Sequence, residues 1–355
     1  MPEAAAPTFG WDIGGANLKA SLVHHGRLHD VAQWPCPLWQ GLDQLDRALA
    51  LAAARWPEHR EARHAVTMTG EMVDLFEDRE DGVLRLADRL QRGLGGRQVA
   101  FYAGDMGWCG IDDVRQRWRE IASANWLASA RHAARVLGTG VLVDIGSTTT
   151  DLVAFEGGEV CTPHRSDAAR LASGELVYHG VVRTPLCAVA PRIGFRGEPC
   201  NVMNEFFATS ADVYRLTGEL DPAHDLHPSA DGAGKDLPAT RQRLARMIGR
   251  DAREAMPEEW LTLARGWRAA QLDEIGGQLD RVLAMHRLPA DAPLVSAGCG
   301  DFLVDGLAKA RGRTTVAYAQ AVVRMSERAQ PSTARWAQVC APSVAVAALF
   351  DEEHG

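Results

Sequence analysis

The chain has 355 residues, of which 46% are hydrophobic and 24% are charged, and its formal net charge is -8 at pH 7. This composition is that of a folded globular protein and excludes a disordered or fibrous chain. The negative net charge argues against a general nucleic-acid binder, whose surface has to neutralise phosphates. At roughly 150 residues per domain, the length predicts two domains or one large duplicated unit.

Cysteine usage and apolar runs indicate the compartment. The seven cysteines are scattered and form no C-x-x-C pair, which argues against a disulfide framework or a zinc ribbon and favours a reducing environment. Residues 1–11 do not combine a basic segment with an apolar one, and no apolar run reaches the length of about eighteen residues that a membrane span needs. We therefore expect a cytoplasmic protein without a membrane span, and the sequence is compatible with an oligomer.

Strands and helices alternate along the first part of the chain. Residues 8–34 alternate apolar and polar positions between turn residues and predict three strands joined by tight turns. A helix, a strand, a second helix and another strand are expected up to Asp105. Apolar residues then recur at helical spacing from Ile111 to Leu137, and Gly138 ends this helical region. Such alternation favours an α/β fold.

The pattern of strand, polar turn and strand restarts after this helical region. The run DIGGANLK (12–19) aligns with DIGSTTTD (144–151), which places Lys19 opposite Asp151. The two copies are roughly 130 residues apart, which is the size of a domain. The sequence therefore predicts a duplicated fold.

The duplication predicts an N-terminal lobe, residues 1–138, and a C-terminal lobe, residues 139–355. The second lobe is longer, and we interpret its Gly/Pro-punctuated and polar segments as substrate-specific insertions over residues 165–290. Within them a helix is expected from Asn201 to Leu216. Two residues of that helix, Asp212 and Arg215, are expected to form a surface ion pair.

Further candidate substrate residues lie in these insertions. One set belongs to the run GELVYHGVVRTPL, and a second occupies a glycine-bearing loop that could close over a diphosphate. Solvated surface positions are the alternative for both sets. The two sets are Glu175, Tyr178, His179 and Arg183, and Asp231, Lys235 and Asp236.

The first Asp-Ile-Gly motif has the composition of a phosphate-binding turn. It supplies Asp12, Gly14, Gly15, Asn17 and Lys19. Glycines let backbone amides approach an anion, and the Lys19 ammonium can neutralise it. A solvated hairpin is the alternative for one such motif, but two copies at domain spacing favour phosphate binding.

The second motif offers hydroxyl and amide donors at the equivalent turn. A buried strand delivers Asp144 to its end, and Asp151 follows the turn. Asp12 and Asp144 are candidate Mg²⁺ ligands, because Mg²⁺ in proteins is held by one or two carboxylates together with substrate phosphates. An ordinary β-hairpin with a polar turn is the alternative. The turn itself consists of Gly146, Ser147, Thr148 and Thr149.

Two other strand ends carry candidate site residues. A strand before Gly298 and Gly300 is followed by a helix, so that helix-terminal amides could face a nucleotide or a diphosphate; a simple helix cap at Asp301 is the alternative. Glu71 follows the strand HAVTM and could face a cleft between the two lobes; a strand-terminal turn near a helix start is the alternative.

These three glycine-rich elements, in this order, resemble the phosphate-1, phosphate-2 and adenosine motifs of the acetate kinase, sugar kinase, Hsp70 and actin superfamily. The resemblance covers nearly the whole chain. It implies an α/β, duplicated ribonuclease-H-like (actin-like ATPase) fold with two lobes and an interlobe cleft, and a site that could take ATP.

Within that superfamily the run VDIGSTTTDLV is similar to the hydantoinase A and oxoprolinase branch. The runs VTMTGEMVDLF, FYAGDMGW, GELVYHGVVRTPL and NEFFATSADVYRLTGEL resemble a smaller family in this branch. Its members are tetrahydromethanopterin-linked C1-transfer pathway proteins, and they are related to an archaeal condensing enzyme of methanofuran biosynthesis.

This resemblance implies a transferase with two small-molecule substrates. The phenol oxygen of γ-glutamyltyramine would displace the diphosphate of an aminomethyl-furanmethanol, giving an aryl ether and pyrophosphate. Lys19 and the glycine-rich turns would hold the diphosphate, Asp12 and Asp144 would organise Mg²⁺, and Asp151 or Glu71 would accept the phenolic proton. The alternatives are an ATP-dependent kinase or hydantoinase-type hydrolase, and a non-enzymatic nucleotide-dependent sensor or scaffold.

Overall fold

A computed structural model describes residues 6–94 and 98–355 of the chain, so the first five residues of the N-terminal segment lie outside the described part. The chain divides into two compact units. Unit 1 consists of Met1–Leu142, Val153–Ala169 and Val316–Gly355, and unit 2 consists of Val143–Leu152 and Arg170–Thr315. These units are interleaved along the sequence, whereas the predicted lobes are contiguous; the lobe boundary at 138/139 stays a prediction.

The first sheet is built on the opening hairpins. Its strand order is β3-β2-β1-β4-β5-β6, with antiparallel pairs β1/β2 and β2/β3 and parallel pairs β1/β4 and β4/β5. His25 and Gly26 both have positive φ, at 52° and 66°, as the tight turn between two strands requires. The strands are β1 (Thr8–Ile13), β2 (Asn17–His24), β3 (Arg27–Pro35), β4 (Arg63–Met68), β5 (Val99–Tyr102) and β6 (Trp108–Cys109).

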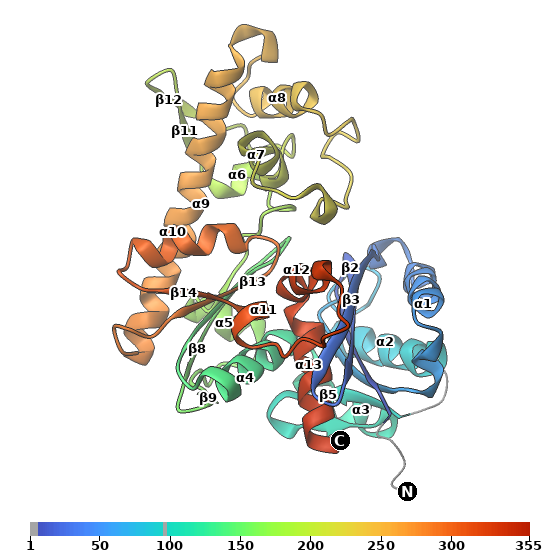
Figure 1. Cartoon of the computed structure of the whole chain (residues 1–355). Helices are drawn as coiled ribbons and strands as arrows, with labels where there is room; N and C mark the ends of the chain where they lie inside the picture. Colours follow the sequence, from blue (N-terminus) through green and yellow to red (C-terminus); the bar gives the residue numbers. More distant parts are fainter. Residues whose placement is uncertain (1–5, 95–97) are drawn as a thin grey trace, which may run out of the picture. The chain divides into compact units, whose positions relative to one another are not determined.

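Helices cover this sheet, and all six residues of β1 are buried. Helix α13 packs on β1 and β2 so closely that a Cβ on Gly10 would collide with the Ser343 carbonyl oxygen and with Ala347. The Ser21 hydroxyl donates a hydrogen bond to that same carbonyl at 2.8 Å. The helices of unit 1 are α1 (Asp43–Arg55), α2 (Arg79–Gly93), α3 (Val114–Ile121), α4 (Asn125–Leu137), α11 (Tyr318–Ala321), α12 (Pro331–Val339) and α13 (Ala341–His354) (Figure 1).

The second sheet repeats the strand order of the first. Its path is β10-β8-β7-β13-β14, and β9 also pairs with β8. With β9 taken as the third strand, the order β9-β8-β7-β13-β14 matches β3-β2-β1-β4-β5. The predicted duplicated, ribonuclease-H-like α/β fold is thereby confirmed. The strands are β7 (Gly140–Ile145), β8 (Thr150–Glu156), β9 (Glu159–Val160), β10 (Leu176–Val177), β13 (Leu294–Ala297) and β14 (Thr315–Ala317).

The insertions of unit 2 gather along one long helix. Helices α7 and α8 and the hairpin β11–β12 pack against α9 (Figure 1). Trp260 and Trp267 of α9 are fully buried, and Trp260 stacks on Phe195 with ring centroids 5.2 Å apart. The elements are α6 (Leu186–Val189), β11 (Arg192–Phe195), β12 (Glu198–Asn201), α7 (Ser210–Thr217), α8 (Leu237–Arg246), α9 (Pro257–His286) and α10 (Val304–Lys309); α5 spans Asp167–Ser173.

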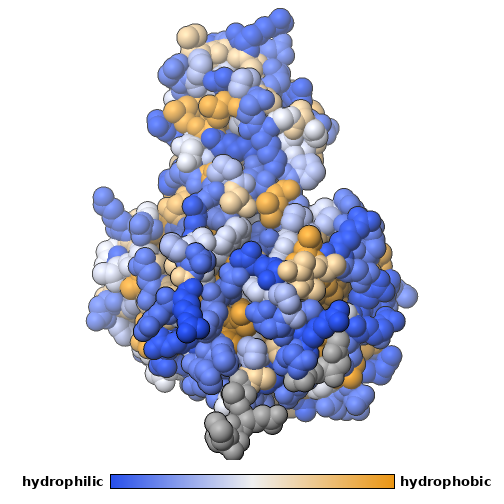
Figure 2. All heavy atoms as spheres, turned by 45° about the vertical axis from the view of Figure 1, so that its right-hand side comes forward, coloured by the Kyte–Doolittle hydropathy of each residue, from blue (hydrophilic) through white to orange (hydrophobic). Residues whose placement is uncertain are grey.

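The surface agrees with the charged composition. Hydrophilic residues dominate the face in Figure 2, and hydrophobic residues appear there in small separate groups. Across the described ranges 6–94 and 98–355, no helix combines the length and the apolar character that crossing a membrane requires.

Candidate phosphate site

The turn between β1 and β2 is held by backbone hydrogen bonds. The Gly14 amide donates to the Asn17 carbonyl at 3.0 Å, and the amide of Leu38 donates to the Gly15 carbonyl at 3.0 Å. The end of β4 closes on the same turn, since the amides of Thr69 and Gly70 both donate to the Ile13 carbonyl at 2.9 Å. The turn therefore has a defined shape.

Asp12 and Lys19 face each other across this hairpin. They are paired in the strand register, and the Lys19 Nζ lies 3.6 Å from an oxygen of Asp12. The Asp12 side chain is 3% exposed, whereas the Lys19 side chain is 23% exposed. An anion that reaches Lys19 therefore also meets the carboxylate of Asp12. Because the two negative charges repel each other, a cation bound between them would stabilise the anion.

The second turn, in unit 2, repeats a backbone hydrogen bond of the first. The Gly146 amide donates to the Thr149 carbonyl at 2.8 Å, as the Gly14 amide does to that of Asn17. The hydroxyl oxygens of Ser147 and Thr148 lie 3.4 Å apart. The sequence alignment of the two motifs thus corresponds to a repeated hydrogen-bonded turn.

The third glycine-rich element packs directly against this second turn. The Gly300 amide donates to the Ile145 carbonyl at 2.8 Å. Gly298 has φ 85°, and a Cβ there would lie 2.5 Å from Oδ1 of Asp144 and would collide with the Ile145 backbone. Unit 2 therefore brings Asp144, the 146–149 turn and both of these glycines together.

Asp151 is engaged by a buried arginine. Its Oδ1 accepts a hydrogen bond from Arg170 at 2.8 Å, and Arg170 also donates to the Glu175 carbonyl at 3.0 Å. The carboxylate of Glu175 in turn accepts from Ser173 at 2.7 Å and lies 3.1 Å from Nε2 of His286. Asp151 is thus paired with Arg170, and its role as a proton acceptor stays a prediction.

Glu71 lies in the interior of unit 1. Ser123 donates to its Oε1 at 2.6 Å and lies 3.2 Å from Asp167, which forms an ion pair with Arg79. Burial raises the pKa of Glu71 to about 7, although the hydrogen bond from Ser123 opposes the rise. Ser123 has φ 51°, a strained conformation for serine.

Three residues of this group escaped the sequence reasoning, namely Ser123, Asp167 and Arg79. They come from three separate segments, and none belongs to a local motif. The one local signal was Glu71 itself, at the end of a strand. Its catalytic role stays a prediction.

The carboxylates at the two turns are Asp12 and Asp144. In the part of the chain that the structure describes, no group of three or more His, Cys, Asp or Glu side chains could hold a metal. This donor chemistry fits Mg²⁺ carried by a phosphate substrate, because such an ion keeps most of its water and phosphate ligands and needs only one or two carboxylates. Asp12 in unit 1 and Asp144 in unit 2 are each a candidate for such a carboxylate ligand.

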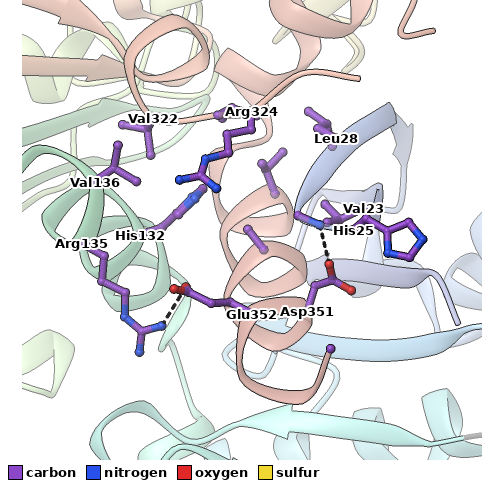
Figure 3. A pocket seen from close by; sticks show the side chains of 15 residues that line it. Val23, His25, Leu28, His132, Arg135, Val136, Val322, Arg324, Asp351 and Glu352 are labelled. Carbon is purple, nitrogen blue, oxygen red and sulfur yellow. Dashed lines mark hydrogen bonds and ion pairs between the residues drawn. The ribbon is translucent and has the colours of Figure 1, made fainter. Parts of the chain in front are cut away.

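A cavity of about 470 Å³ lies elsewhere in unit 1 (Figure 3). Nδ1 of His132 is 2.7 Å from the Tyr318 hydroxyl, and burial lowers the pKa of His132 to about 4. Figure 3 shows Arg324 pointing toward His132 and Arg135 paired with Glu352. The described lining contains none of the predicted site residues; it consists of Val23, His25, Gly26, Leu28, His132, Arg135, Val136, Val322, Val323, Arg324, Val344, Ala348, Asp351, Glu352 and Gly355.

Known proteins resemble this chain in sequence and in fold. A (4-{4-[2-(gamma-L-glutamylamino)ethyl]phenoxymethyl}furan-2-yl)methanamine synthase from Methanocaldococcus jannaschii is 27% identical over 282 residues, which cover 79% of this chain and 82% of that protein. A synthase of the same name from Methanococcus vannielii is 27% identical over 170 residues, covering 48% of this chain and 75% of its own.

Among solved structures, a nucleotide-free acetone carboxylase matches with a TM-score of 0.50 and 10% identity, over 85% of this chain and 67% of that chain. A ROK family glucokinase from Streptomyces griseus, in complex with glucose and AMPPNP, has a TM-score of 0.47 and 13% identity, over 98% of this chain and 99% of that chain. The sequence profile of the hydantoinase/oxoprolinase family matches residues 63–326 of the chain. The sequence motifs, the duplicated fold and this match agree: the chain belongs to the hydantoinase/oxoprolinase family.

Proposed function

We propose that the chain is a transferase of methanofuran-type cofactor biosynthesis that joins a furan and a phenol through an ether. The observation that carries the proposal is its similarity to the synthase from M. jannaschii, over 79% of this chain and 82% of that protein. The name of that synthase describes a phenoxymethyl-furan, in which one ether oxygen links a phenol ring to a furan methylene. The repeated glycine-rich turns support phosphate chemistry for the same chain.

The proposed reaction exchanges one carbon–oxygen bond for another. The bond between the furan methylene and the diphosphate oxygen breaks, and pyrophosphate leaves with the bonding electrons. The phenol oxygen of γ-glutamyltyramine forms the new bond, and its proton passes to a base. A furan ring stabilises positive charge on the adjacent methylene, so binding the leaving group is the main demand on the protein.

The proposed roles follow from the residues at the two turns. Lys19 would bind phosphate oxygens through its charge, and the backbone amides of each glycine-rich turn would bind them through hydrogen bonds. Asp12 in unit 1 and Asp144 in unit 2 are each a proposed ligand of Mg²⁺, which when bound would supply positive charge to the leaving diphosphate. Of the two candidate proton acceptors, Glu71 has the pKa suited to accepting a proton near neutral pH, whereas Asp151 is paired with Arg170.

Reconstitution with both substrates tests this proposal. The full chain is incubated with Mg²⁺, the aminomethyl-furanmethanol diphosphate and γ-glutamyltyramine, and the products are followed by mass spectrometry and a pyrophosphate assay. Equal amounts of ether and pyrophosphate are expected. Hydrolysis of the diphosphate without any ether, at every ratio of the two substrates, would rule out the transferase.

An ATP-dependent kinase or hydantoinase-type hydrolase is the second candidate. The family match favours it, because the family is that of hydantoinase and oxoprolinase. Incubation with MgATP separates the two functions. Substrate-dependent release of ADP would support the hydrolase, and the transferase predicts none.

A further inference from the structure

The cavity in Figure 3 lies away from the first phosphate turn. Its walls come from the β2–β3 hairpin, α4, α13 and the segment after α11, and all of its lining residues belong to unit 1. Val23 lines the cavity, and it is about 13 Å from Lys19 along β2 at the usual rise of a strand. A volume of about 470 Å³ is typical of small-molecule sites.

Hydrogen bonds fix three walls of the cavity to one another. The Leu28 amide donates to the Arg324 carbonyl at 2.8 Å, and the Ser326 amide donates to the Leu28 carbonyl at 2.9 Å. The Gly26 amide of the hairpin donates to Oδ2 of Asp351 in α13 at 2.7 Å. The hairpin, the segment after α11 and α13 therefore keep a defined arrangement around the cavity.

The two acidic side chains of the lining have cationic partners. Glu352 pairs with Arg135 at 3.2 Å, and Asp351 pairs with Arg63 at 2.6 Å. The fifth charged group, Arg324, is exposed, and within residues 6–94 and 98–355 its guanidinium forms no hydrogen bond or ion pair. One positive charge at the cavity thus has no negative partner in the described part of the chain.

His132 presents a second polar group to the cavity. The residue is only 9% exposed, and its Nδ1 lies 2.7 Å from the Tyr318 hydroxyl. The contact of that hydroxyl with the Ala341 carbonyl is longer, at 3.5 Å, so the Tyr318 proton is better placed to bind Nδ1. Nε2 then carries the imidazole proton, and it has no hydrogen-bond partner among the described residues. Figure 3 shows Arg324 pointing toward this ring.

The rest of the lining is largely apolar. Val136 of α4 lines the cavity and is 47% exposed, whereas Val322 and Val344 are buried beside it. A pocket with apolar walls and a few convergent polar groups is the usual form of a site for a small organic molecule. The lining therefore suits a ligand with an apolar part as well as a charge.

We propose that this cavity binds a small monocarboxylate with an aliphatic tail. The carboxylate accepts hydrogen bonds from the Arg324 guanidinium and from Nε2 of His132, and the tail contacts the valines. A single negative charge matches the one guanidinium without a partner, whereas the second charge of a phosphate would be repelled by Asp351 and Glu352. The site does not depend on the proposed transferase reaction.

NMR titration of the full chain with isovalerate, its uncharged amide isovaleramide and inorganic phosphate tests the proposal. Isovalerate should bind more tightly than the amide or phosphate. Arg324→Gln should weaken isovalerate binding by about tenfold or more, the usual loss for a hydrogen bond to a charged group. The same variant should leave isovaleramide binding unchanged, because the amide has no charge for Arg324 to neutralise.

Two further variants separate the cavity from general surface charge. Val136→Trp places a large ring at an exposed position of the lining and should weaken the binding of both isovalerate and isovaleramide. Arg328→Gln is the matched control, because Arg328 is an exposed arginine of the same segment that does not line the cavity. It should bind isovalerate like the unchanged protein.

Three results would overturn the proposal. The first is an unchanged protein that binds no isovalerate at millimolar concentration. The second is equal isovalerate binding in Arg324→Gln, Val136→Trp and the unchanged protein. The third is phosphate binding that is as tight as that of isovalerate and is lost in Arg324→Gln, which would make the cavity a general anion site and not a carboxylate site.

Discussion

Glu71 is a carboxyl group placed where its charged form is disfavoured. It is fully buried, and its Oε2 has no hydrogen-bond partner among the described residues. Ser123 contacts both Glu71 and Asp167, so a buried carboxyl and a partly buried carboxylate share one hydroxyl. A proton on Glu71 relieves the burial cost, which explains a pKa near neutrality.

Replacing Glu71 by Gln should change how stability depends on pH. The pKa of Glu71 is about 7 in the folded chain against 4.5 as the usual value, so its stabilising contribution is complete below pH 4.5 and is lost as pH rises through 7. The Glu71→Gln variant should lack this loss. The difference in the free energy of unfolding between the variant and the unchanged protein should therefore shift by roughly 3 kcal/mol in favour of the variant from pH 4 to pH 8.

Urea denaturation at several pH values measures this difference. Glu77→Gln is the control, because Glu77 is exposed and its variant should follow the unchanged protein at every pH. A constant difference between Glu71→Gln and the unchanged protein from pH 4 to pH 8 would contradict the proposed titration.

His132 should lower the free energy of unfolding at acid pH, whereas Glu71 lowers it as pH rises. Its pKa of about 4, lowered by burial from 6.5, keeps it neutral in the folded chain while the unfolded chain binds a proton. Stability should therefore fall as pH decreases from 6.5 to 4, and His132→Gln should reduce this fall. Tyr318→Phe removes the hydrogen bond but keeps the imidazole, so it should retain the full acid dependence. If the free energy of unfolding depended on pH equally in His132→Gln and Tyr318→Phe, the acid dependence could not be assigned to His132.

At the scale of elements, the turns were predictable and their surroundings were not. An Asp-Ile-Gly strand end with a polar turn is a local pattern, and the hydrogen bonds of Gly14 and Gly146 follow from it. The group around Glu71 could not be predicted, because Ser123 and Asp167 reach it from distant segments. Local patterns do not encode such contacts.

Two predictions for the insertions were wrong, each for its own physical reason. Asp212 and Arg215 do form an ion pair, but Asp212 is fully buried rather than on the surface. Helices α8 and α9 cover α7, which the local sequence does not reveal. The expected helix from Asn201 begins only at Ser210, where Thr209 and Asp212 form a capping box.

Packing of α13 on the first sheet should depend on Gly10. Gly10→Ala adds a Cβ against the Ser343 carbonyl and Ala347, and overpacking of this kind costs about 1–3 kcal/mol or more. Calorimetric unfolding should show a clearly lower Tm. Gly110→Ala is the matched control, since a Cβ there meets no atom within 4 Å and φ is -82°. A Tm for Gly10→Ala equal to that of Gly110→Ala would refute the close contact.

For the whole molecule, fold and chemistry are separate conclusions. The family and the duplicated fold follow from motifs, strand order and the match over residues 63–326. A fold of this class serves many reactions, so it does not by itself choose between an organic diphosphate and ATP. The proposed transferase reuses a phosphate-binding architecture for a leaving group, with no phosphoryl transfer to the acceptor.

The most direct test of the proposed transferase is therefore to identify which bond of the furan diphosphate breaks. The full chain is given γ-glutamyltyramine and a furan diphosphate labelled with oxygen-18 at the atom that joins the methylene to phosphorus, and both products are examined by mass spectrometry. The transferase predicts that the label leaves entirely in pyrophosphate and that the ether carries the unlabelled phenol oxygen. Label retained on the furan methylene would mean cleavage between oxygen and phosphorus, and would contradict displacement of diphosphate from carbon.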